Sequence, residues 1–399
     1  MSDELPPGWS RHKLTDVVLL PTGQVNPQSL PYRAQPLLAP DHVESATGRI
    51  MTLESAEAQG ASSGKYIVRP GDVILSKIRP ALRKVALARF NGTCSADMYP
   101  MRSLRLAPEI LQSELLGERF SLFAESVSGR TGIPKLNRSD LSSYELNIPP
   151  AAEQSRIIKI LESMSESEYT AEGEVLKAEA VRRGLVESLI SRKATVFSQF
   201  LTDGPSNGIY KPAECYGENG IPIVRIGSFD GGPSDLTSGL LRVRVSDAEI
   251  ERFSIRVGDV LINRVNTPGL VGKSTVVSRL DELTLYESNI MRCRVDSSKI
   301  SPLLVQEWLS SSLVRAYFAS RTKPAVSQAS INRRDILSCP MPIMSSAEQG
   351  AFLDRLDAVD NCIRVGRARV AKLKSLKYAL SADLLSGRTA KFVARVYAS

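Results

Sequence analysis

The sequence predicts an α+β fold, with two tandem α+β domains that are each followed by a long α-helix. Three observations predict it. A segment of the chain recurs at a fixed offset, each copy ends in a stretch with heptad spacing, and the rest carries β-branched runs broken by turn residues. Two similar helices in one chain pair most easily as an antiparallel coiled coil, so we expect a pseudo-twofold repeat.

The internal repeat is defined by short matching segments. Leu136-Asn137-Arg138-Ser139-Asp140-Leu141 corresponds to Ile331-Asn332-Arg333-Arg334-Asp335-Ile336, 195 residues later, and Glu153-Gln154 corresponds to Glu348-Gln349 at the same offset. Upstream, Arg69-x-Gly71-Asp72-Val73 pairs with Arg256-x-Gly258-Asp259-Val260 at an offset of 187, so an insertion or deletion lies between. Each half therefore has a variable front part and a constant back part.

The constant parts are predicted to be helices, because apolar residues follow a 4-3 spacing for almost five heptads. The positions that we expect to pair the helices or to dock a partner are Ile157, Leu161, Met164, Val175, Arg182, Leu185, Leu189, Phe352, Leu356, Val359, Ile363, Val370, Leu373, Lys377, Leu380 and Leu384. Arg182, Lys377 and Glu168 are polar seam positions. A polar residue costs stability in a sealed seam, so we interpret these three as places where a partner's helices join.

Five segments follow from this pattern. We predict domains at 1–150 and 195–345, spacer helices at 151–194 and 346–390, and a tail at 391–399. Pro149-Pro150 precedes the first helix, Ser345-x-x-Glu348 offers a capping box to the second, and Gly387 can supply its left-handed C-terminal cap.

The front domains are predicted to contain twisted sheets. Strand-like runs lie at 65–68, 72–75, 221–226 and 259–262, and shorter apolar helical stretches follow at 109–125 and 302–319. We therefore expect each front part to be a small α+β domain.

Polar and basic residues follow the predicted strands at matching places in both halves. Arg makes paired bonds to guanine, Asn and Gln make them to adenine, and Ser, Thr and Lys bind phosphates. For any one residue a solvated loop charge is the alternative interpretation, but both halves place the same chemistry at matching positions. The candidate DNA-binding residues are Lys77, Arg79, Arg83, Lys84, Arg130, Thr131, Lys135, Asn137, Arg225, Asn263, Arg264, Asn266, Lys273, Ser274, Arg321, Lys323, Gln328, Ser330 and Asn332.

The composition of the chain argues against several classes of protein. The 399 residues carry a formal net charge of +8, which permits phosphate contact but does not establish it. No apolar run approaches the roughly 20 residues of a membrane span, and the first residues lack the features of a signal peptide, so we expect a cytoplasmic protein. The five cysteines form no C-x-x-C pair, so neither a disulfide framework nor a zinc site is predicted.

The sequence contains no complete catalytic motif that we recognise. Gly272-Lys273-Ser274 resembles the end of a phosphate-binding loop, but the glycine required five positions before Gly272 is replaced by Thr267. The two histidines, His12 and His42, both lie in the first half, so no histidine site repeats in both copies. The sequence also lacks a dinucleotide fingerprint and the Asp/Asn-Pro-Pro-Tyr/Phe segment of adenine methyltransferases. We expect no catalytic residue, metal or cofactor in this chain.

The combination of motifs resembles the DNA-specificity subunit of type I restriction-modification enzymes over nearly the whole length. It consists of Leu5-Pro6-Pro7-Gly8-Trp9 with Lys13-Leu14, the paired Gly-Asp-Val strands, Leu136-Asn137 with Ile331-Asn332, and the Pro-Pro-x-x-Glu-Gln helix start. The second helix departs from the pattern, because Met341-Pro342-Ile343-Met344 lacks the double proline.

This resemblance implies that the front parts are target-recognition domains, each reading one half of a bipartite site in double-stranded DNA. It also implies that the helices set the spacer and dock two methyltransferase subunits. Adenine methylation with S-adenosylmethionine would belong to those partners, and ATP- and Mg-dependent cleavage to a third, restriction subunit.

Other functions stay open at this point. The chain could serve a modification-only or related phage-defence methyltransferase complex rather than a restriction system. It could instead be a coiled-coil adaptor that binds protein alone, or an enzyme whose active site has no recognised motif.

Overall fold

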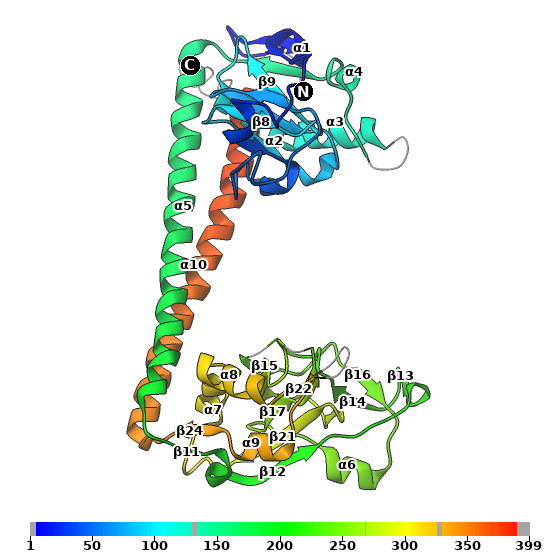
Figure 1. The fold of residues 1–399 in the computed structure, drawn as a ribbon, viewed down its shortest axis with the longest axis vertical. Coiled ribbons are helices and arrows are strands. Elements are labelled where there is room, and N and C mark those ends of the chain that lie inside the picture. The colour runs from blue at the N-terminus through cyan, green and yellow to red at the C-terminus, as the bar shows by residue number, and fades with distance from the viewer. Residues whose placement is uncertain (1–4, 130–133, 231, 268, 325–328, 389–399) are drawn as a thin grey trace, which may run out of the picture. The chain divides into compact units, whose positions relative to one another are not determined.

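Helices and β-sheets are combined in both halves of the computed structural model, which confirms the predicted α+β fold class (Figure 1). The structure describes residues 5–129, 134–230, 232–267, 269–324 and 329–388. The chain divides into unit 1, within Met1–Glu172 and Ala368–Ser399, and unit 2, Gly173–Arg367. Each unit contains a segment of both long helices, α5 (Ala151–Ser188) and α10 (Ser346–Ser386). The predicted five-segment division stays a prediction.

Unit 1 contains two four-stranded sheets, in the strand orders β2-β9-β6-β7 and β4-β3-β8-β5, and a separate β1-β10 pair. Its strands are β1 (Ser10–Lys13), β2 (Val18–Leu19), β3 (Pro36–Leu38), β4 (Glu54–Ser55), β5 (Tyr66–Val68), β6 (Asp72–Ser76), β7 (Val85–Leu87), β8 (Gly92–Cys94), β9 (Met98–Ser103) and β10 (Glu145–Ile148). Its shorter helices are α1 (Leu14–Val17), α2 (Pro108–Leu116), α3 (Glu118–Ser128) and α4 (Arg138–Leu141).

Unit 2 repeats the first of these sheets as β12-β21-β17-β19 and adds β15 at its edge; its other sheets are β13-β16-β14-β20, β18-β23-β22 and β11-β24. Its strands are β11 (Ala194–Val196), β12 (Leu201–Asn207), β13 (Tyr216–Gly217), β14 (Ile221–Val224), β15 (Gly232–Asp235), β16 (Leu241–Val243), β17 (Val260–Asn263), β18 (Val265–Asn266), β19 (Ser274–Arg279), β20 (Leu285–Tyr286), β21 (Ile290–Val295), β22 (Lys323–Pro324), β23 (Ala329–Ser330) and β24 (Pro340–Pro342). Its shorter helices are α6 (Asp247–Phe253), α7 (Pro302–Leu309), α8 (Ser312–Arg321) and α9 (Arg333–Leu337).

The repeated Gly-Asp-Val motif starts the central strand of each main sheet. Gly71 has a φ of +89° and the matching Gly258 has a φ of +92°, which a residue with a Cβ rarely adopts. The next residue, Asp72, accepts the Arg69 N–H at 2.8 Å and binds the Arg102 guanidinium at 3.0 Å. Asp259 does the same with the backbone of Arg256 at 2.9 Å and the side chain of Arg294 at 3.1 Å. The motif therefore builds one turn twice.

The helical stretch predicted in each front domain is two helices rather than one. In unit 1, Gly117 ends α2 in an extended conformation and α3 begins directly after it. In unit 2, Ser311 caps α8, because its side chain accepts the Val314 N–H at 3.4 Å. A glycine and a serine cap interrupt the helices where the apolar periodicity continues.

The Glu-Gln pair at the start of each long helix ties that helix to its own domain. Gln154 accepts the Ala107 N–H at 2.8 Å, just before α2, and donates to the Pro149 carbonyl at 3.0 Å. Gln349 accepts the Ser301 N–H at 2.8 Å, just before α7, and donates to the carbonyls of Lys299 and Met344 at 2.8 and 3.1 Å. One glutamine thus caps a second helix in each unit.

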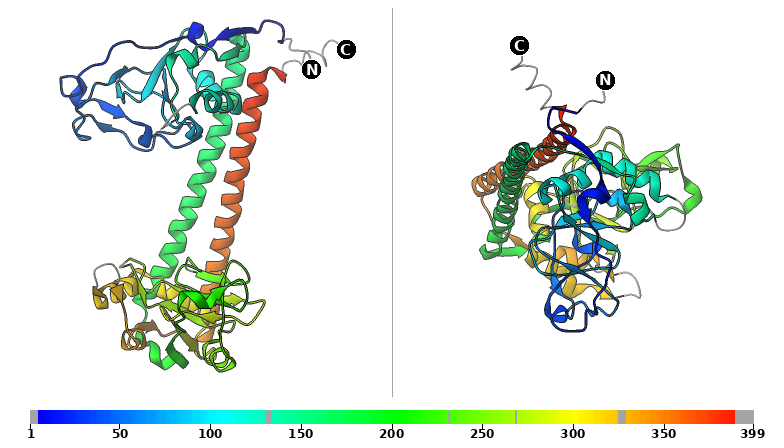
Figure 2. Two further views of the ribbon diagram at one scale, coloured as in Figure 1. Left: turned by 90° about the vertical axis from the view of Figure 1, so that its right-hand side faces the viewer. Right: turned by 90° about the horizontal axis from the view of Figure 1, so that it is seen from above.

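Within each unit, the segments of α5 and α10 run side by side and antiparallel, as Figure 1 and the left view of Figure 2 show. In unit 1, Glu168 pairs with Lys377 at 3.2 Å and Glu172 pairs with Lys374 at 2.9 Å. In unit 2, Arg182 pairs with Asp360 at 2.6 Å. The antiparallel helix pairing that the sequence predicts is confirmed.

The predicted helix-pairing residues are all buried or half-buried, as the heptad pattern predicts. The predicted pairing residues with the least exposure are Ile157, Leu161, Leu189, Phe352, Leu356, Ile363 and Leu384. The others are half-buried: Met164, Val175, Arg182, Leu185, Val359, Val370, Leu373, Lys377 and Leu380. The ends of the helices are buried because they pack into the domain cores. Ile157, Leu161 and Leu384 join the core of unit 1, and Leu189, Phe352 and Leu356 join that of unit 2.

The polar seam positions have partners within the chain. Lys377 binds Glu168, and Arg182 binds both Asp360 and, at 2.9 Å, the buried Glu307 of α7. These charges are matched by residues of their own unit, so they give no sign that a partner's helices join there. Docking of a partner at these positions stays a prediction.

The ends of α10 form as the sequence predicts. Ser345 and Glu348 make the capping box, with the Ser345 N–H donating to Glu348 at 2.8 Å and the Glu348 N–H donating to Ser345 at 3.3 Å. The Ser345 backbone and the Arg192 side chain hold the pKa of Glu348 at about 2. At the other end Gly387 has a φ of +74°. The capping box replaces the missing double proline. Within the described ranges, no helix is both long and apolar enough to cross a membrane.

Candidate nucleic-acid interface

The structure brings the two predicted basic loops of unit 1 side by side. Ile78 forms a β-bridge with Lys135, the Arg79 N–H donates to the Pro134 carbonyl at 2.9 Å, and the Leu136 N–H donates to the Lys77 carbonyl at 2.8 Å. The segments after β6 and before α4 therefore form one surface, although more than fifty residues separate them in sequence.

Unit 2 pairs its two basic loops through the same backbone bond. The Ile331 N–H donates to the Arg264 carbonyl at 3.0 Å, and β18 pairs with β23, matching Val265 with Ser330. Lys77 and Arg264 also receive equivalent contacts on their other side, because their N–H groups donate to the carbonyls of Asp97 and Asn289 at 2.8 and 2.9 Å. A basic residue therefore occupies the same backbone position in both units.

Lys77 lies in an aromatic pocket of unit 1. Its side chain is only 8% exposed, and its ammonium lies 4.5 Å from the ring centre of Tyr99 and 5.3 Å from that of Tyr66. Among the residues that the structure describes, no carboxylate pairs with it. Burial lowers the pKa of the Lys77 ammonium. Arg138 of α4 lies over the opposite part of the same cluster, with its guanidinium 5.7 Å from the Tyr99 ring. Contacts of this kind between a cation and aromatic rings stabilise the charged side chains in place.

Strained backbone marks the loop that follows Lys77. Arg79 and Arg83 have φ values of 50° and 46°, in the left-handed region that side chains other than glycine rarely occupy. Such strain persists only where the surrounding structure enforces it, and it is common at functional sites. The Arg79 and Lys135 side chains are exposed, so both are accessible to a ligand.

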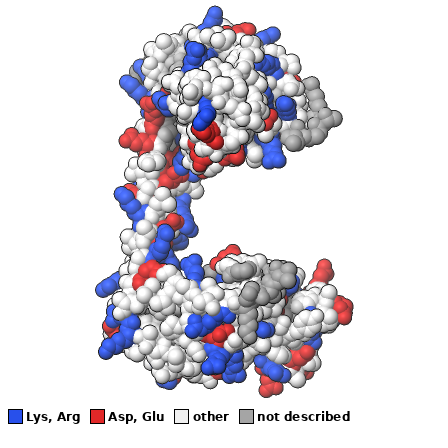
Figure 3. All heavy atoms as spheres, in the orientation of Figure 1, with Lys and Arg blue, Asp and Glu red and all other residues white. Residues whose placement is uncertain are grey.

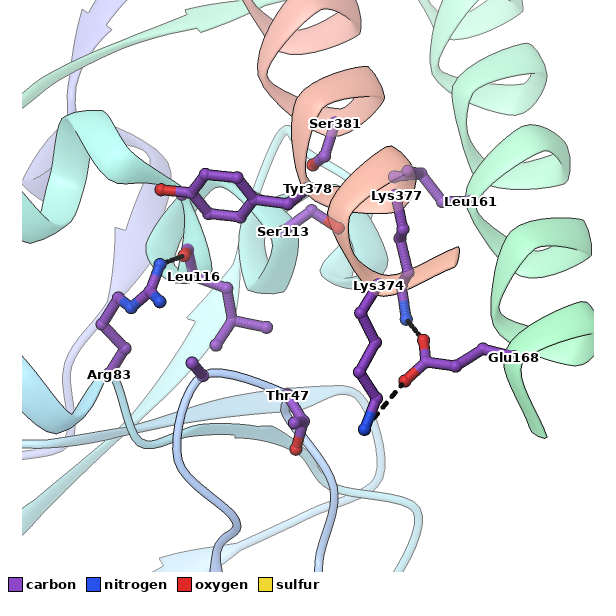
Figure 4. Close-up of a pocket in the computed structure, with 12 residues that line it drawn as sticks. Thr47, Arg83, Ser113, Leu116, Leu161, Glu168, Lys374, Lys377, Tyr378 and Ser381 are labelled. Carbon is purple, nitrogen blue, oxygen red and sulfur yellow. Dashed lines mark hydrogen bonds and ion pairs between the residues drawn. The ribbon is translucent and has the colours of Figure 1, made fainter. Parts of the chain in front are cut away.

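Arg83 is directed toward Leu116 and Tyr378 (Figure 4). It donates to the Leu116 carbonyl at 3.4 Å and lies 5.3 Å from the Tyr378 ring, at the edge of a pocket of about 300 Å³ that Glu168, Lys374 and Lys377 also line. Lys84 donates to the Pro40 carbonyl at 2.7 Å. The structure thus gives Arg83 and Lys84 contacts within unit 1.

The predicted side chains of unit 2 differ in accessibility. Asn263 and Ser274 are buried in the main sheet, and Asn266 accepts the Thr267 N–H at 2.8 Å. Lys273 lies 5.5 Å from the Phe229 ring and 3.5 Å from the Asp230 carboxylate. Arg264 is half-buried, and its Nε has no hydrogen-bond partner among the described residues.

Three further arginine and serine positions lie near these loops. Arg225 is exposed, pairs with Glu287 at 3.1 Å and lies over the Tyr216 ring. Arg321 lies 3.7 Å from the ring centre of Tyr317. Ser330 is half-buried within β23.

Asn137 and Asn332 have a structural role as helix N-caps. Each starts a capping box with the aspartate three residues later, and the Asp335 N–H donates to Asn332 at 3.1 Å. Of the remaining predicted residues, Arg130, Thr131 and Gln328 lie outside the described residues, as does the side chain of Lys323.

Sequence reasoning missed the aromatic residues of the site. Tyr66 and Tyr99 lie on β5 and β9, and Tyr210 of unit 2 is 79% exposed beside Arg225 in a pocket of about 420 Å³. Tyr66 lies in the strand-like run 65–68, whereas Tyr99 and Tyr210 lie in none of the predicted strands or short helices. A tyrosine beside a turn is the one signal that could have identified Tyr210.

Surface charge on both units is mixed rather than concentrated. On the face that Figure 3 shows, basic and acidic side chains alternate over each unit. In the described part of the chain, no group of three or more His, Cys, Asp or Glu side chains is arranged to hold a metal ion. Cys94, Cys293 and Cys339 are buried, and burial raises the pKa of all three thiols.

Sequence comparisons identify relatives of one kind. Residues 54–177 match the family model for the type I restriction modification DNA specificity domain. The chain is 32% identical over 203 residues to the specificity subunit of the type I restriction enzyme EcoDI of Escherichia coli, covering 50% of this chain and 45% of that subunit. It is 21% identical over 316 residues to the MjaVIII specificity subunit of Methanocaldococcus jannaschii, covering 73% and 70%. The chain thus spans about half the length of the EcoDI relative that it matches.

Two solved structures share the fold. A chain from a structure of a type I R-M system, concerned with complex assembly and conformational transition, superposes with a TM-score of 0.68 at 20% identity, covering 96% of this chain and 99% of that one. The HsdS subunit from Thermoanaerobacter tengcongensis superposes with a TM-score of 0.50 at 20% identity, covering 96% and 98%.

Proposed function

Because the chain resembles the DNA-specificity subunits of type I restriction-modification enzymes in sequence and fold, we propose that it is the sequence-reading subunit of such a complex. In this proposal each unit recognises one half of a bipartite site in double-stranded DNA. The chain itself is not catalytic, and methylation and cleavage belong to its partner subunits.

One observation carries the proposal. The Leu-Asn or Ile-Asn segment donates to the carbonyl of a basic residue, Lys77 in unit 1 and Arg264 in unit 2, so the same two loops meet in both units. The backbone arrangement is repeated, whereas the side chains that it presents differ. A repeated frame with unequal side chains suits recognition of two different half-sites.

The basic side chains of the proposed interface fall into two groups, those that would contact phosphates and those that would contact bases. Lys135 in unit 1, whose side chain is exposed, would contact a phosphate as a point charge, because an ammonium has no planar fork. Arg79 and Arg264 would reach base edges, where guanidinium binds guanine through two hydrogen bonds. Tyr66 and Tyr99 would hold the Lys77 ammonium in place.

The long helices would dock two methyltransferase subunits. Several apolar side chains on them are exposed rather than packed: Ile160, Tyr169, Leu176, Val181, Val365 and Leu376. Exposed apolar residues on a helix favour association with another protein. S-adenosylmethionine would bind to the methyltransferase subunits, and ATP and Mg to a restriction subunit where the complex has one.

Exchanging residues 1–150 for those of another specificity subunit should change one half of the recognised sequence and leave the other half intact. The physical reason is that the two basic loops of each unit are held together by backbone hydrogen bonds within that unit. The measurement is genome-wide mapping of methylated adenines in cells that co-express the chimaera and a cognate methyltransferase.

A change in both half-sites would contradict this modular assignment. Incubating the purified chain alone with DNA, magnesium and S-adenosylmethionine is the companion experiment, since methyl transfer or cleavage would favour an enzyme. Assembly with the methyltransferase but no sequence preference in the complex would favour a protein adaptor.

Replacing Lys135 by methionine should weaken DNA binding for all sequences alike and lower the slope of log affinity against log salt by about 1, because one phosphate contact is lost. Lys159→Met is the matched control, since Lys159 is an exposed lysine on α5 with the same charge. Fluorescence anisotropy of a labelled duplex at several salt concentrations measures both. An unchanged salt slope in Lys135→Met would place the phosphate contacts elsewhere.

Replacing the buried Lys77 by methionine should change how the stability of the protein depends on pH. Burial lowers the pKa of Lys77 below its ordinary value of 10.5, so between the two values the unfolded chain binds more protons than the folded chain. Stability of the unaltered protein should therefore rise with pH across that window. Lys77→Met should lack this rise, as urea unfolding at a series of alkaline pH values would show.

A further inference from the structure

A pocket in unit 2 is lined by three arginines that the proposed DNA interface does not use. Arg252 at the end of α6, Arg292 on β21 and Arg333 at the start of α9 enclose it together with Ser206, Asn207 and the rings of Phe253 and Tyr286. Its volume is about 460 Å³, within the roughly 300–1,000 Å³ usual for ligand sites.

The pocket has more positive charge than its carboxylates neutralise. Arg292 binds Asp203 at 2.6 Å, and Asp203 is shared with Arg294 at 3.5 Å, which also binds Asp259. Among the residues that the structure describes, neither Arg252 nor Arg333 has an acidic partner. Like charges brought together without counter-charges repel one another, so a bound anion would stabilise this arrangement.

Arg292 contributes a buried donor to the same pocket. The residue is only 6% exposed, its two terminal nitrogens donate to the Ser254 carbonyl at 3.0 Å and to Asp203, and its Nε has no partner among the described residues. A buried donor without an acceptor costs free energy comparable to a lost hydrogen bond. Arg292 thus adds to the lining of the pocket a guanidinium with one unsatisfied N–H.

We propose that the pocket formed by Arg252, Arg292 and Arg333 binds a phosphate group. Guanidinium matches phosphate because its planar fork donates two parallel hydrogen bonds to two oxygens. Arg252 and Arg333 lie 81 residues apart in the sequence and line one pocket, so two separate segments would contact the phosphate. The hydroxyl of Ser206 and the amide of Asn207 supply further polar groups at its rim.

This site is separate from the paired loops that carry the proposed function. None of its lining residues lies in the loop after β17 or in the segment from Arg321 to Ser330. A phosphate could come from the DNA backbone or from a small phosphorylated molecule. The chemistry of recognition is the same, and the experiment distinguishes the two sources.

The test uses the full-length chain and two charge-matched double variants. Arg252→Gln/Arg333→Gln removes the two unpaired guanidiniums, whereas Arg315→Gln/Arg334→Gln removes two exposed arginines of the same unit that do not line the pocket. Calorimetric titration with inorganic phosphate and with pyrophosphate should show saturable binding by the unaltered chain. The pocket variant should bind at least about tenfold more weakly, and the control within about twofold.

A thermal-shift measurement in phosphate against chloride of equal ionic strength serves as a second readout. Phosphate salts stabilise proteins in general by exclusion from the surface, and that effect would be equal in both double variants. Specific binding should instead raise Tm in the control and not in the pocket variant. Equal shifts, or no saturable phosphate binding by the unaltered chain, would overturn the proposal.

Binding of a labelled duplex identifies the source of the phosphate. A loss of about tenfold in duplex affinity for the pocket variant alone, together with the loss of inorganic phosphate binding, assigns the site to the DNA backbone. Unchanged duplex affinity with the same loss of inorganic phosphate and pyrophosphate binding assigns it to a small phosphorylated ligand. Both outcomes support a phosphate site.

Discussion

Replacing Arg182 by alanine should lower the free energy of unfolding of unit 2 by about 3–5 kcal/mol, because it leaves a buried carboxylate without its cation. Arg182 on α5 binds Glu307 of α7 at 2.9 Å and Asp360 of α10 at 2.6 Å, and thus joins three helices. Glu307 is only 5% exposed. Urea unfolding, followed by the fluorescence of the buried Trp308 in a Trp9→Phe background, measures the loss.

The matched control is Arg183→Ala. Arg183 is the exposed neighbour on α5, so its removal should change stability by no more than about 0.5 kcal/mol. A double variant, Arg182→Leu/Glu307→Leu, should recover most of the stability, since replacing both members of a buried pair by apolar residues is often neutral or stabilising. A loss below about 1 kcal/mol in Arg182→Ala would show that water solvates Glu307 and that the pair is not important.

The pH dependence of Arg182→Ala follows from the same contact. Burial raises the pKa of Glu307, and Arg182 opposes that rise. Without Arg182, the Glu307 carboxylate of the folded protein should become protonated at a higher pH than the same carboxylate in the unfolded chain. The variant should therefore gain stability relative to the unaltered protein as pH falls from neutral through that raised pKa.

Replacing Gln349 by leucine should lower the stability of unit 2 by about 3 kcal/mol, because three backbone groups lose their partners at once. Gln349 is buried, and its amide bonds the Ser301 N–H and the carbonyls of Lys299 and Met344. These groups lie at the starts of α7 and α10, where no helical partner replaces the lost bonds. The Trp308 fluorescence measurement applies here as well.

Gln199→Leu is the control for this substitution. Gln199 is exposed, and within the described residues its side chain bonds only the Thr195 hydroxyl, so the expected change is within about 0.5 kcal/mol. Gln349→Glu should fall between the two, because a carboxylate still accepts the Ser301 N–H but cannot donate to the carbonyls. Equal stability of Gln349→Leu and Gln199→Leu would contradict the assigned role.

The helices and the repeated motifs were predictable from the sequence. Heptad spacing predicts α5 and α10 over most of their observed lengths, and the capping box of Ser345 and Glu348 starts α10 as predicted. The Gly-Asp-Val motif predicts the central strand of each main sheet. These features depend on residues within a few positions of one another, so periodicity and local bonding encode them.

The candidate site was predictable at the level of loops but not of side chains. The two loops of each half were identified, yet Asn263 and Ser274 are buried, Asn137 and Asn332 cap helices, and Arg83 turns toward Tyr378. Which way a loop residue points depends on the segment beside it. Here that segment lies more than fifty residues away along the chain, as the contact of Lys77 with Leu136 shows.

The sequence by itself determined the duplication, the two long helices and the positions of the basic loops. Short matching segments show the duplication and place the loops, and heptad spacing predicts the helices. Only the tertiary structure decided that Arg182 and Lys377 find carboxylates within their own units, and that Arg252, Arg292 and Arg333 converge on one pocket. The physical reason is that charge matching and cavity formation depend on contacts between distant segments. Those contacts arise when the sheets and the helix segments of each unit pack, and no local pattern specifies them.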